Sequence, residues 1–315
     1  MNLLQLIEQY VAFRQALGER FQTNAAILRA FGRALDVGVD MDDVAPERVK
    51  AFLDGTGPIT SSWHIKHNAL RGFYSYAISR GYVATAPLPP VIPKRPPAFV
   101  PYIYSHEELR RLLQAIDSFR STRSCLDSIT LRTLVLLLYG TGLRVGEALA
   151  LDRADVDWDQ SLLTVRRTKF FKTRLVPFGP QLGQALIQYV ARPQSSSPMP
   201  LEGAPLFTTR AGVRVKRRTL DSTFRRLCQS AGLRRSDGAR YEPRLHDLRH
   251  SFAVHRLTSW YRQGADVQKL LPHLAVYLGH VHLAGTQVYL SMTPDLLQEA
   301  AGRFARYAGE EVPHD

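Results

Sequence analysis

The chain has 315 residues, and its 41 Lys and Arg against 28 Asp and Glu give a formal net charge of +13. Hydrophobic residues make up 45%, enough for buried cores in about two domains, and the positive surplus favours a polyanionic partner, above all nucleic acid. The longest apolar run, Leu134 to Tyr139, is too short to cross a membrane, and two cysteines are too few for a disulfide framework. We expect a cytoplasmic protein in which Cys125 and Cys228 are reduced and partly buried.

Residues 1–85 carry apolar side chains at helical spacing. Pro46 suits the first position of one helix, and Ser61 or Ser62 suits the cap of another over about residues 63–80. Seven prolines then lie between residues 84 and 101. Because proline fixes φ and lacks an N–H, residues 86–103 are predicted to form an extended linker between domains at 1–85 and 104–315.

The second domain opens with a capping box, Ser105 to Glu108, and is predicted to be mainly helical. Three short segments with β-branched or alternating character predict a small antiparallel sheet, at residues 156–158, 162–167 and 174–178. Helices are expected at about 127–139, 182–190, 218–231, 246–261, 266–278 and 294–307. The fold class is therefore mainly α with a small antiparallel sheet (α+β). The apolar stripe of the last helix is predicted to pack either on its own domain or on a neighbouring protomer.

Four short motifs carry the residues for phosphodiester chemistry. They are Thr-Gly-Leu-Arg144-Val-Gly-Glu147, His246-Asp-Leu-Arg249-His250, Leu-Gly-His280 and, nine positions later, Tyr289. Arginine grips phosphate oxygens through paired N–H groups, histidine moves protons, and tyrosine can attack as a covalent nucleophile. Tyr277 is the competing tyrosine, but it precedes Leu-Gly-His and is expected to pack.

Local spacing assigns supporting roles and argues against a metal. Glu147 lies one helical turn after Arg144 and is expected to brace it or a neighbouring histidine, while His250 packs or donates to backbone. His246 and His250 have the i, i+4 spacing of some zinc sites, but no glutamate of an HExxH motif lies between them and no cysteine cluster is near. We expect neither a metal nor another cofactor.

The order and spacing of these motifs resemble the tyrosine recombinase (phage integrase) family, over roughly residues 104–307. The resemblance implies a helical core-binding (SAM-like) DNA-binding domain and a catalytic domain that form a C-shaped clamp on double-stranded DNA. It implies cleavage through a 3′-phosphotyrosine and a homotetramer on two DNA sites, with accessory proteins or sister recombinases as further partners. The catalytic residues it implies are Arg144, Lys169, His246, Arg249, His280 and Tyr289, where Lys169 is the general acid and Lys172 the alternative.

The long segment before Leu278 and the residues after Tyr289 resemble the branch of transposon-borne integrases, which implies integration or excision of a mobile element. Two alternatives stay open: a non-catalytic or regulatory DNA-binding protein of the same fold, and strand relaxation like that of a type IB topoisomerase. Candidates for DNA contact are basic or polar side chains of both domains and of the linker, namely Lys66, His67, Arg71, Lys94, Arg95, Lys172, Arg174, Lys216, Arg217 and Arg218.

Overall fold

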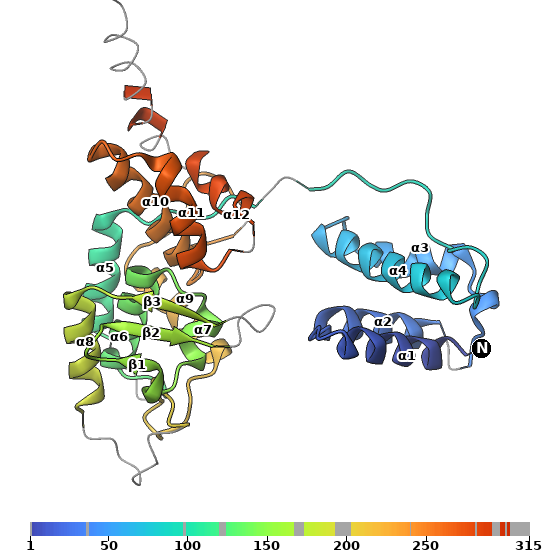
Figure 1. The fold of residues 1–315 in the computed structure, drawn as a ribbon, viewed down its shortest axis with the longest axis horizontal. Helices are drawn as coiled ribbons and strands as arrows, with labels where there is room; N and C mark the ends of the chain where they lie inside the picture. The colour runs from blue at the N-terminus through green and yellow to red at the C-terminus, as the bar shows by residue number, and fades with distance from the viewer. Residues whose placement is uncertain are drawn as a thin grey trace, which may run out of the picture. The chain divides into compact units, whose positions relative to one another are not determined.

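The computed structural model divides the chain into two compact units, Met1–Phe99 and Val100–Asp315. Helices dominate both units (Figure 1). Within the described ranges, no helix is long and apolar enough to span a bilayer. The structure describes residues 2–35, 38–96, 99–119, 124–166, 173–192, 203–239, 241–280, 282–291, 297–299 and 301–302.

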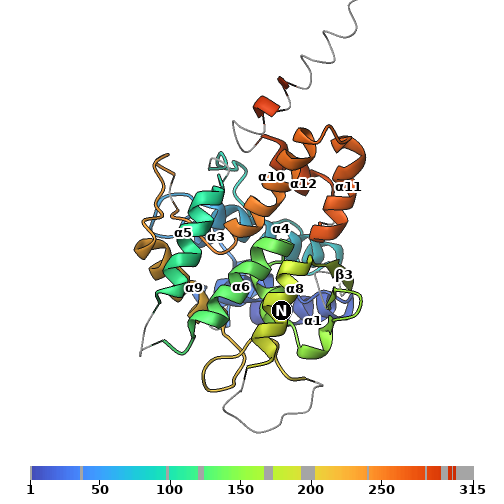
Figure 2. The ribbon, with the colours of Figure 1, turned by 90° about the vertical axis from the view of Figure 1, so that its left-hand side faces the viewer.

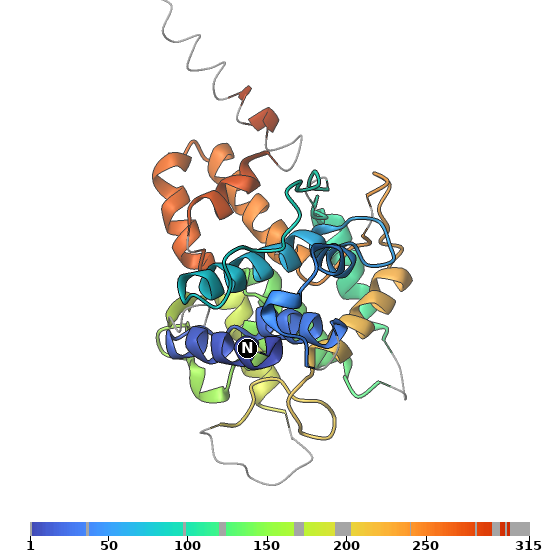
Figure 3. The ribbon, with the colours of Figure 1, turned by 90° about the vertical axis from the view of Figure 1, so that its right-hand side faces the viewer.

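The N-terminal unit packs four α-helices around one apolar core. These are α1 (Leu3–Ala16), α2 (Gln22–Ala34), α3 (Pro46–Asp54) and α4 (Ser61–Ser79), drawn from dark blue to cyan in Figure 3. Pro46 opens α3 as predicted, whereas the cap of α4 is Thr60, whose hydroxyl accepts from the Ser62 N–H. Both α1 and α2 contact α4, and their shared core includes Leu6, Leu28, Phe31 and Phe73, all fully buried.

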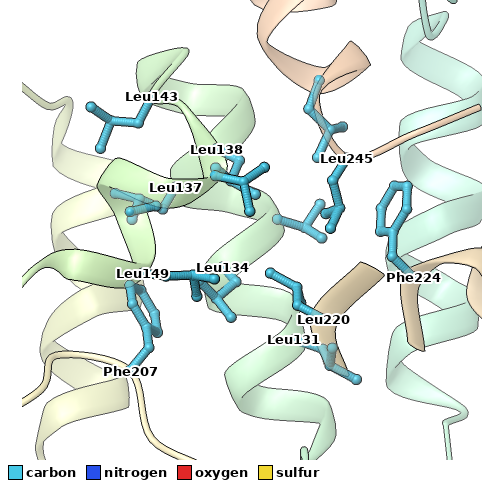
Figure 4. Packing of buried hydrophobic residues seen from close by; sticks show 14 of the residues in the cluster. Leu131, Leu134, Leu137, Leu138, Leu143, Leu149, Phe207, Leu220, Phe224 and Leu245 are labelled. Carbon is cyan, nitrogen blue, oxygen red and sulfur yellow. The ribbon is translucent and has the colours of Figure 1, made fainter. Parts of the chain in front are cut away.

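The second unit is built around α6 (Ser128–Thr141), a largely apolar helix that Asp127 caps through the Thr130 N–H. It contacts α5 (His106–Asp117), α8 (Pro180–Val190) and α10 (Asp247–Arg262), which surround it in Figure 2. Leucines of α6 share a core with Leu220 and Phe224 of α9 (Arg217–Ser230) and with Leu245 (Figure 4). Burial around α6 thus fixes where α10 begins.

A small antiparallel sheet lies in the same unit, in the order β1 (Val156–Asp157), β2 (Leu162–Val165) and β3 (Arg174–Pro177). The register pairs Val165 with Arg174, so the hairpin of β2 and β3 opens toward residues 167–172, which lie outside the described residues. Because β3 contacts α11 (Val267–Leu278), Arg174 lies near the end of that helix.

A second small core holds α10 and α11 together with α12 (Ala284–Gln287) and the 3₁₀ helix Val288–Ser291. These segments gather at one end of the unit, in orange and red in Figures 1 and 2. Of the predicted last helix, 294–307, the described parts 297–299 and 301–302 are helical and the rest lies outside the described residues. Cys228 is buried, but Cys125 is exposed, contrary to the expected partial burial of both.

Candidate active site

Arg144 caps α7 (Val145–Ala150), directly after the turn that ends α6. Gly142 makes this turn with a φ of +60°, and a Cβ there would lie 2.6 Å from Phe252, so the turn needs glycine. Nη1 of Arg144 donates to Glu147 Oε1 at 2.8 Å, and Nη2 donates to the Gly279 carbonyl at 3.0 Å. The Arg144 side chain remains 37% exposed, so a phosphate can still reach it.

Glu147 braces Arg144, as its place one turn along the helix predicts. Its carboxylate accepts from the Arg144 backbone N–H at 2.9 Å and from the Arg174 guanidinium at 3.0 and 2.8 Å. Burial alone would raise the pKa of Glu147, but Arg174 and then Arg144 lower it to about 2. The carboxylate is therefore ionised at neutral pH.

Arg249 lies in the first turn of α10 and is 2% exposed. Its Nη1 donates to the Gly142 carbonyl and its Nη2 to the Leu278 carbonyl, both at 2.7 Å. Burial, and then the charge of Arg144, lower the pKa of Arg249 to about 10, so the guanidinium is still positive at neutral pH. Two motifs a hundred residues apart thus place their arginines at one site.

His280 follows Gly279, which ends α11 in the left-handed conformation with a φ of +70°. Its Nε2 lies 3.0 Å from Arg249 Nη2, and its Nδ1 lies 2.7 Å from Thr286 Oγ1. Burial, followed by the charges of Arg249 and Arg144, lowers the pKa of His280 to about 4. The ring is therefore neutral near pH 7.

Tyr289 lies in the 3₁₀ helix beside these groups and is 3% exposed. Its ring centroid is 6.1 Å from that of His280 and 5.6 Å from that of His250, which in turn lies 4.9 Å from His246. Burial raises the pKa of Tyr289 above its ordinary value, while Arg249 and Arg144 oppose the rise. The phenol thus lies where neighbouring cations favour its ionised form.

His255, on the same helix as His250, does not join His246 and His250 in a metal site. His255 instead pairs with Tyr139, whose Oη lies 2.8 Å from its Nδ1, and stacks on His106. Burial lowers the pKa of His246 and of His250 to about 4, and His250 Nδ1 is buried without a partner among the described residues. In the part of the chain that is described, no three His, Cys, Asp or Glu side chains could hold a metal ion.

Two candidates for DNA contact point into the protein instead. His67 is 5% exposed and stacks on Trp63 at 5.1 Å between centroids, because its face of α4 packs on the core. The Arg174 side chain is 12% exposed and is held by Glu147 and by the carbonyl of Tyr277. These contacts correct their assignment as direct DNA contacts.

Lys66 is partly buried, and its Nζ donates to the Phe52 carbonyl at 2.7 Å. Lys169 and Lys172 lie outside the described residues. The other candidates for DNA contact have exposed side chains, namely Arg71, Lys94, Arg95, Lys216, Arg217 and Arg218.

Sequence reasoning missed two residues that hold the site together, Thr286 and, in its inward role, Arg174. Thr286 is fully buried against His280. Its signal in the sequence is weak, because a threonine six residues after a histidine is common by chance. Arg174 follows two lysines in the sequence, so the sequence alone suggests one more basic residue of a hairpin. Its partner, Glu147, is far away in the chain.

Comparison with known proteins covers most of the chain. The model of the phage integrase family matches residues 103–295. The chain is 35% identical to y4rB of Sinorhizobium fredii, an integrase/recombinase by name, over 96% of each chain. It is 29% identical to the tyrosine recombinase XerA of Thermococcus kodakarensis, over 94% of each.

Solved structures share the fold at lower identity. The integrase of transposon Tn1549, in complex with a circular intermediate DNA, matches with a TM-score of 0.70 at 17% identity, over 96% of this chain and 99% of that one. A lambda integrase dimer bound to a core site matches with a TM-score of 0.65 at 18% identity, over 93% and 97%. With the family model and the relatives above, these likenesses establish that the chain belongs to the phage integrase family of tyrosine recombinases, the enzymes of site-specific DNA recombination.

Proposed function

We propose that this protein cuts and rejoins double-stranded DNA through a 3′-phosphotyrosine intermediate on Tyr289. The observation that carries the proposal is the place of the Tyr289 phenol, beside His280 and within reach of the Arg249 charge. A phenol ordinarily loses its proton near pH 10, so it needs stabilisation of negative charge as it attacks. The two arginines of the site supply that charge.

Each remaining group takes one role. Arg144 and Arg249 bind the non-bridging oxygens of the scissile phosphate. His280 accepts a hydrogen bond from Arg249 through Nε2 and so orients that guanidinium at the phosphate. His246 is neutral at pH 7, because burial lowers its pKa to about 4, and it can accept the proton that leaves Tyr289.

The bond changes balance without an external energy source. The Tyr289 oxygen bonds to phosphorus while the bond to the 5′ oxygen breaks, and Lys169 gives that oxygen its proton. Attack by the 5′-hydroxyl of another strand reverses the step, rejoins DNA and releases tyrosine. The phosphoester bond is kept in the covalent link, so the reaction needs no nucleotide hydrolysis.

The Tyr289 phenol is covered in this structure, so the protein must expose it before cleavage. Tyr289 is 3% exposed, whereas Arg144 is 37% exposed. A phosphate that docks on Arg144 therefore meets Tyr289 only after the 3₁₀ helix or its flanks shift. If DNA binding drives this shift, the nucleophile stays covered until DNA is bound.

Net charge and the relatives support the proposed substrate and setting. The net charge of +13 and exposed arginines and lysines in both units support a duplex DNA partner. The fold shared with a transposon integrase supports integration and excision of a mobile element. We further propose a homotetramer on two DNA sites, with residues 1–85 as a DNA-binding domain, residues 86–103 as a linker and residues 104–315 as the catalytic domain.

A plasmid with two copies of the DNA that flanks the gene tests this function. Wild-type protein should exchange strands between the copies and yield deleted or inverted plasmid, read by junction PCR. Relaxed plasmid without exchange would favour the topoisomerase-like alternative. A gel shift without either product would favour the non-catalytic DNA-binding protein.

A further inference from the structure

Arg174 is an arginine of the site that faces inward rather than toward a ligand. It is the first residue of β3, where the hairpin returns from residues 167–172. Its side chain is 12% exposed, compared with 61% for Arg166, which lies just beyond the end of β2 and pairs with Asp155. Two basic residues of one hairpin stem thus have opposite environments.

The contacts of Arg174 join three separate segments. Nη1 and Nη2 donate to the two carboxylate oxygens of Glu147, at 3.0 and 2.8 Å, and Nε donates to the Tyr277 carbonyl at 3.1 Å. The guanidinium also lies against Gly279, where a Cβ would be 2.8 Å from Nη1. The hairpin is therefore fixed to α7 and to the end of α11, next to His280.

Glu147 pairs with both Arg174 and Arg144. How its negative charge is divided between them sets how far it offsets the positive charge of Arg144. With Arg174 in place, the carboxylate has a paired, fork-to-fork partner on its inner side. Without Arg174, Arg144 would be the closest counter-ion of a buried carboxylate and would be drawn more tightly to it. Its positive charge would then be offset before a phosphate arrived.

We propose that Arg174 is a positioning residue of the recombination site, which neutralises Glu147 and thereby leaves the charge of Arg144 available to the scissile phosphate. The same contacts hold β3 against α7 and the end of α11. This inference rests on the proposed function for the identity of the phosphate, whereas the pairing itself is a property of the fold.

The test compares Arg174→Met, Arg174→Lys and the double variant Arg174→Met/Glu147→Gln, with Arg166→Met as the matched control. Two quantities are measured below the Tm of every variant: the single-turnover rate of the DNA–protein adduct on nicked duplex, and the Kd for that duplex. Arg174→Met should form adduct at least about tenfold more slowly with a nearly unchanged Kd. Arg174→Lys should keep part of the rate, because it retains the charge but not the fork.

The double variant separates charge balance from folding. Since it removes both buried charges, the double variant should form adduct faster than Arg174→Met. If the two substitutions acted independently, their effects on the rate would multiply and the double variant would be slower. Arg166→Met should match wild type. An adduct rate for Arg174→Met equal to that of wild type, or a double variant slower than Arg174→Met, would overturn the inference.

A second readout does not depend on DNA chemistry. Inorganic phosphate should raise the Tm of wild type above that in potassium chloride of equal ionic strength. Arg144→Ala and Arg174→Met should lose most of this shift, and the double variant should regain part of it. Absence of adduct with wild type would reject the proposed function but not the role of Arg174. In that case, a phosphate-induced rise in Tm that is the same in Arg174→Met as in wild type would reject the role of Arg174.

Discussion

Arg249 Nη2 lies 3.0 Å from His280 Nε2, and this contact fixes where the imidazole carries its proton. Arginine is a donor only, so Nε2 must accept, and a neutral ring then holds its proton on Nδ1. That proton faces Thr286 Oγ1 at 2.7 Å. A buried threonine behind the site therefore holds the tautomer of a residue at its centre.

Thr286→Val should lower the cleavage rate by about tenfold, because it leaves the His280 Nδ1–H without an acceptor in a buried place. Thr286→Ser keeps the hydroxyl and should retain most of the rate. Single-turnover cleavage of nicked duplex measures both variants. Equal rates for the Val and Ser variants would show that the threonine serves packing alone.

The two site arginines should differ in what they do for stability. Arg249→Ala leaves two buried carbonyls without a donor and should lower the free energy of unfolding by about 2–3 kcal/mol. Arg144→Ala, at a half-exposed position, should change it by less than about 1 kcal/mol. Both should slow cleavage by at least about a hundredfold. Urea unfolding beside the cleavage assay checks the contrast, and equal destabilisation would contradict the burial described here.

Gly279 and Gly264 allow the effect of the Arg174 contact to be separated from that of the backbone conformation. Both have a φ of +70°, but only Gly279 has the Arg174 guanidinium within 3.2 Å of a built Cβ, whereas Gly264 has nothing within 4 Å. Gly264→Ala should cost about 1–2 kcal/mol for the left-handed backbone alone. Gly279→Ala should destabilise more and also slow cleavage. Similar loss of Tm in both variants would argue that the Arg174 contact is unimportant.

Stability should fall as the medium becomes acidic, because burial lowers the pKa of four histidines to about 4 from an ordinary 6.5. Between these two values the unfolded chain binds protons that the folded chain does not. The free energy of unfolding should thus decrease from about pH 6.5 toward 4, with uptake of up to four protons, and should not depend on these groups above about pH 7. The histidines are His246, His250, His255 and His280.

Denaturant titrations at about pH 7 and pH 5 measure this dependence. Glu147 acts in the same direction at lower pH, because its pKa of about 2 lies below the ordinary 4.5, and its contribution is lost as pH falls through that range. A free energy of unfolding that stays constant from pH 7 to pH 5 would contradict the buried state of the histidines.

The sequence predicts the chemical groups of the site better than their supports. The spacing of Arg144, Arg249 and Tyr289 carries information because each belongs to a motif with glycine or histidine at fixed offsets. Helices and strands followed from periodicity, with ends shifted by a few residues, as for β2, which ends at Val165 rather than at 167.

Side-chain direction was harder to predict, because it depends on contacts between distant segments. His67 lies among polar neighbours in the sequence, yet α4 turns it into the core against Trp63. Arg174 could face either side of its strand, and its inward direction follows from Glu147, which lies 27 positions earlier in the chain. No local pattern encodes that pairing.

Covalent trapping of DNA on Tyr289 is the decisive measurement for the proposed chemistry. Wild type, Tyr289→Phe and Tyr277→Phe are incubated with nicked duplexes that tile the DNA flanking the gene, then separated in SDS with EDTA present. Tyr277 is the matched control, a partly buried tyrosine whose hydroxyl donates to the Pro177 carbonyl outside the proposed chemistry. We expect a DNA-linked band with wild type and Tyr277→Phe and none with Tyr289→Phe. A band that persists in Tyr289→Phe would contradict the proposed chemistry.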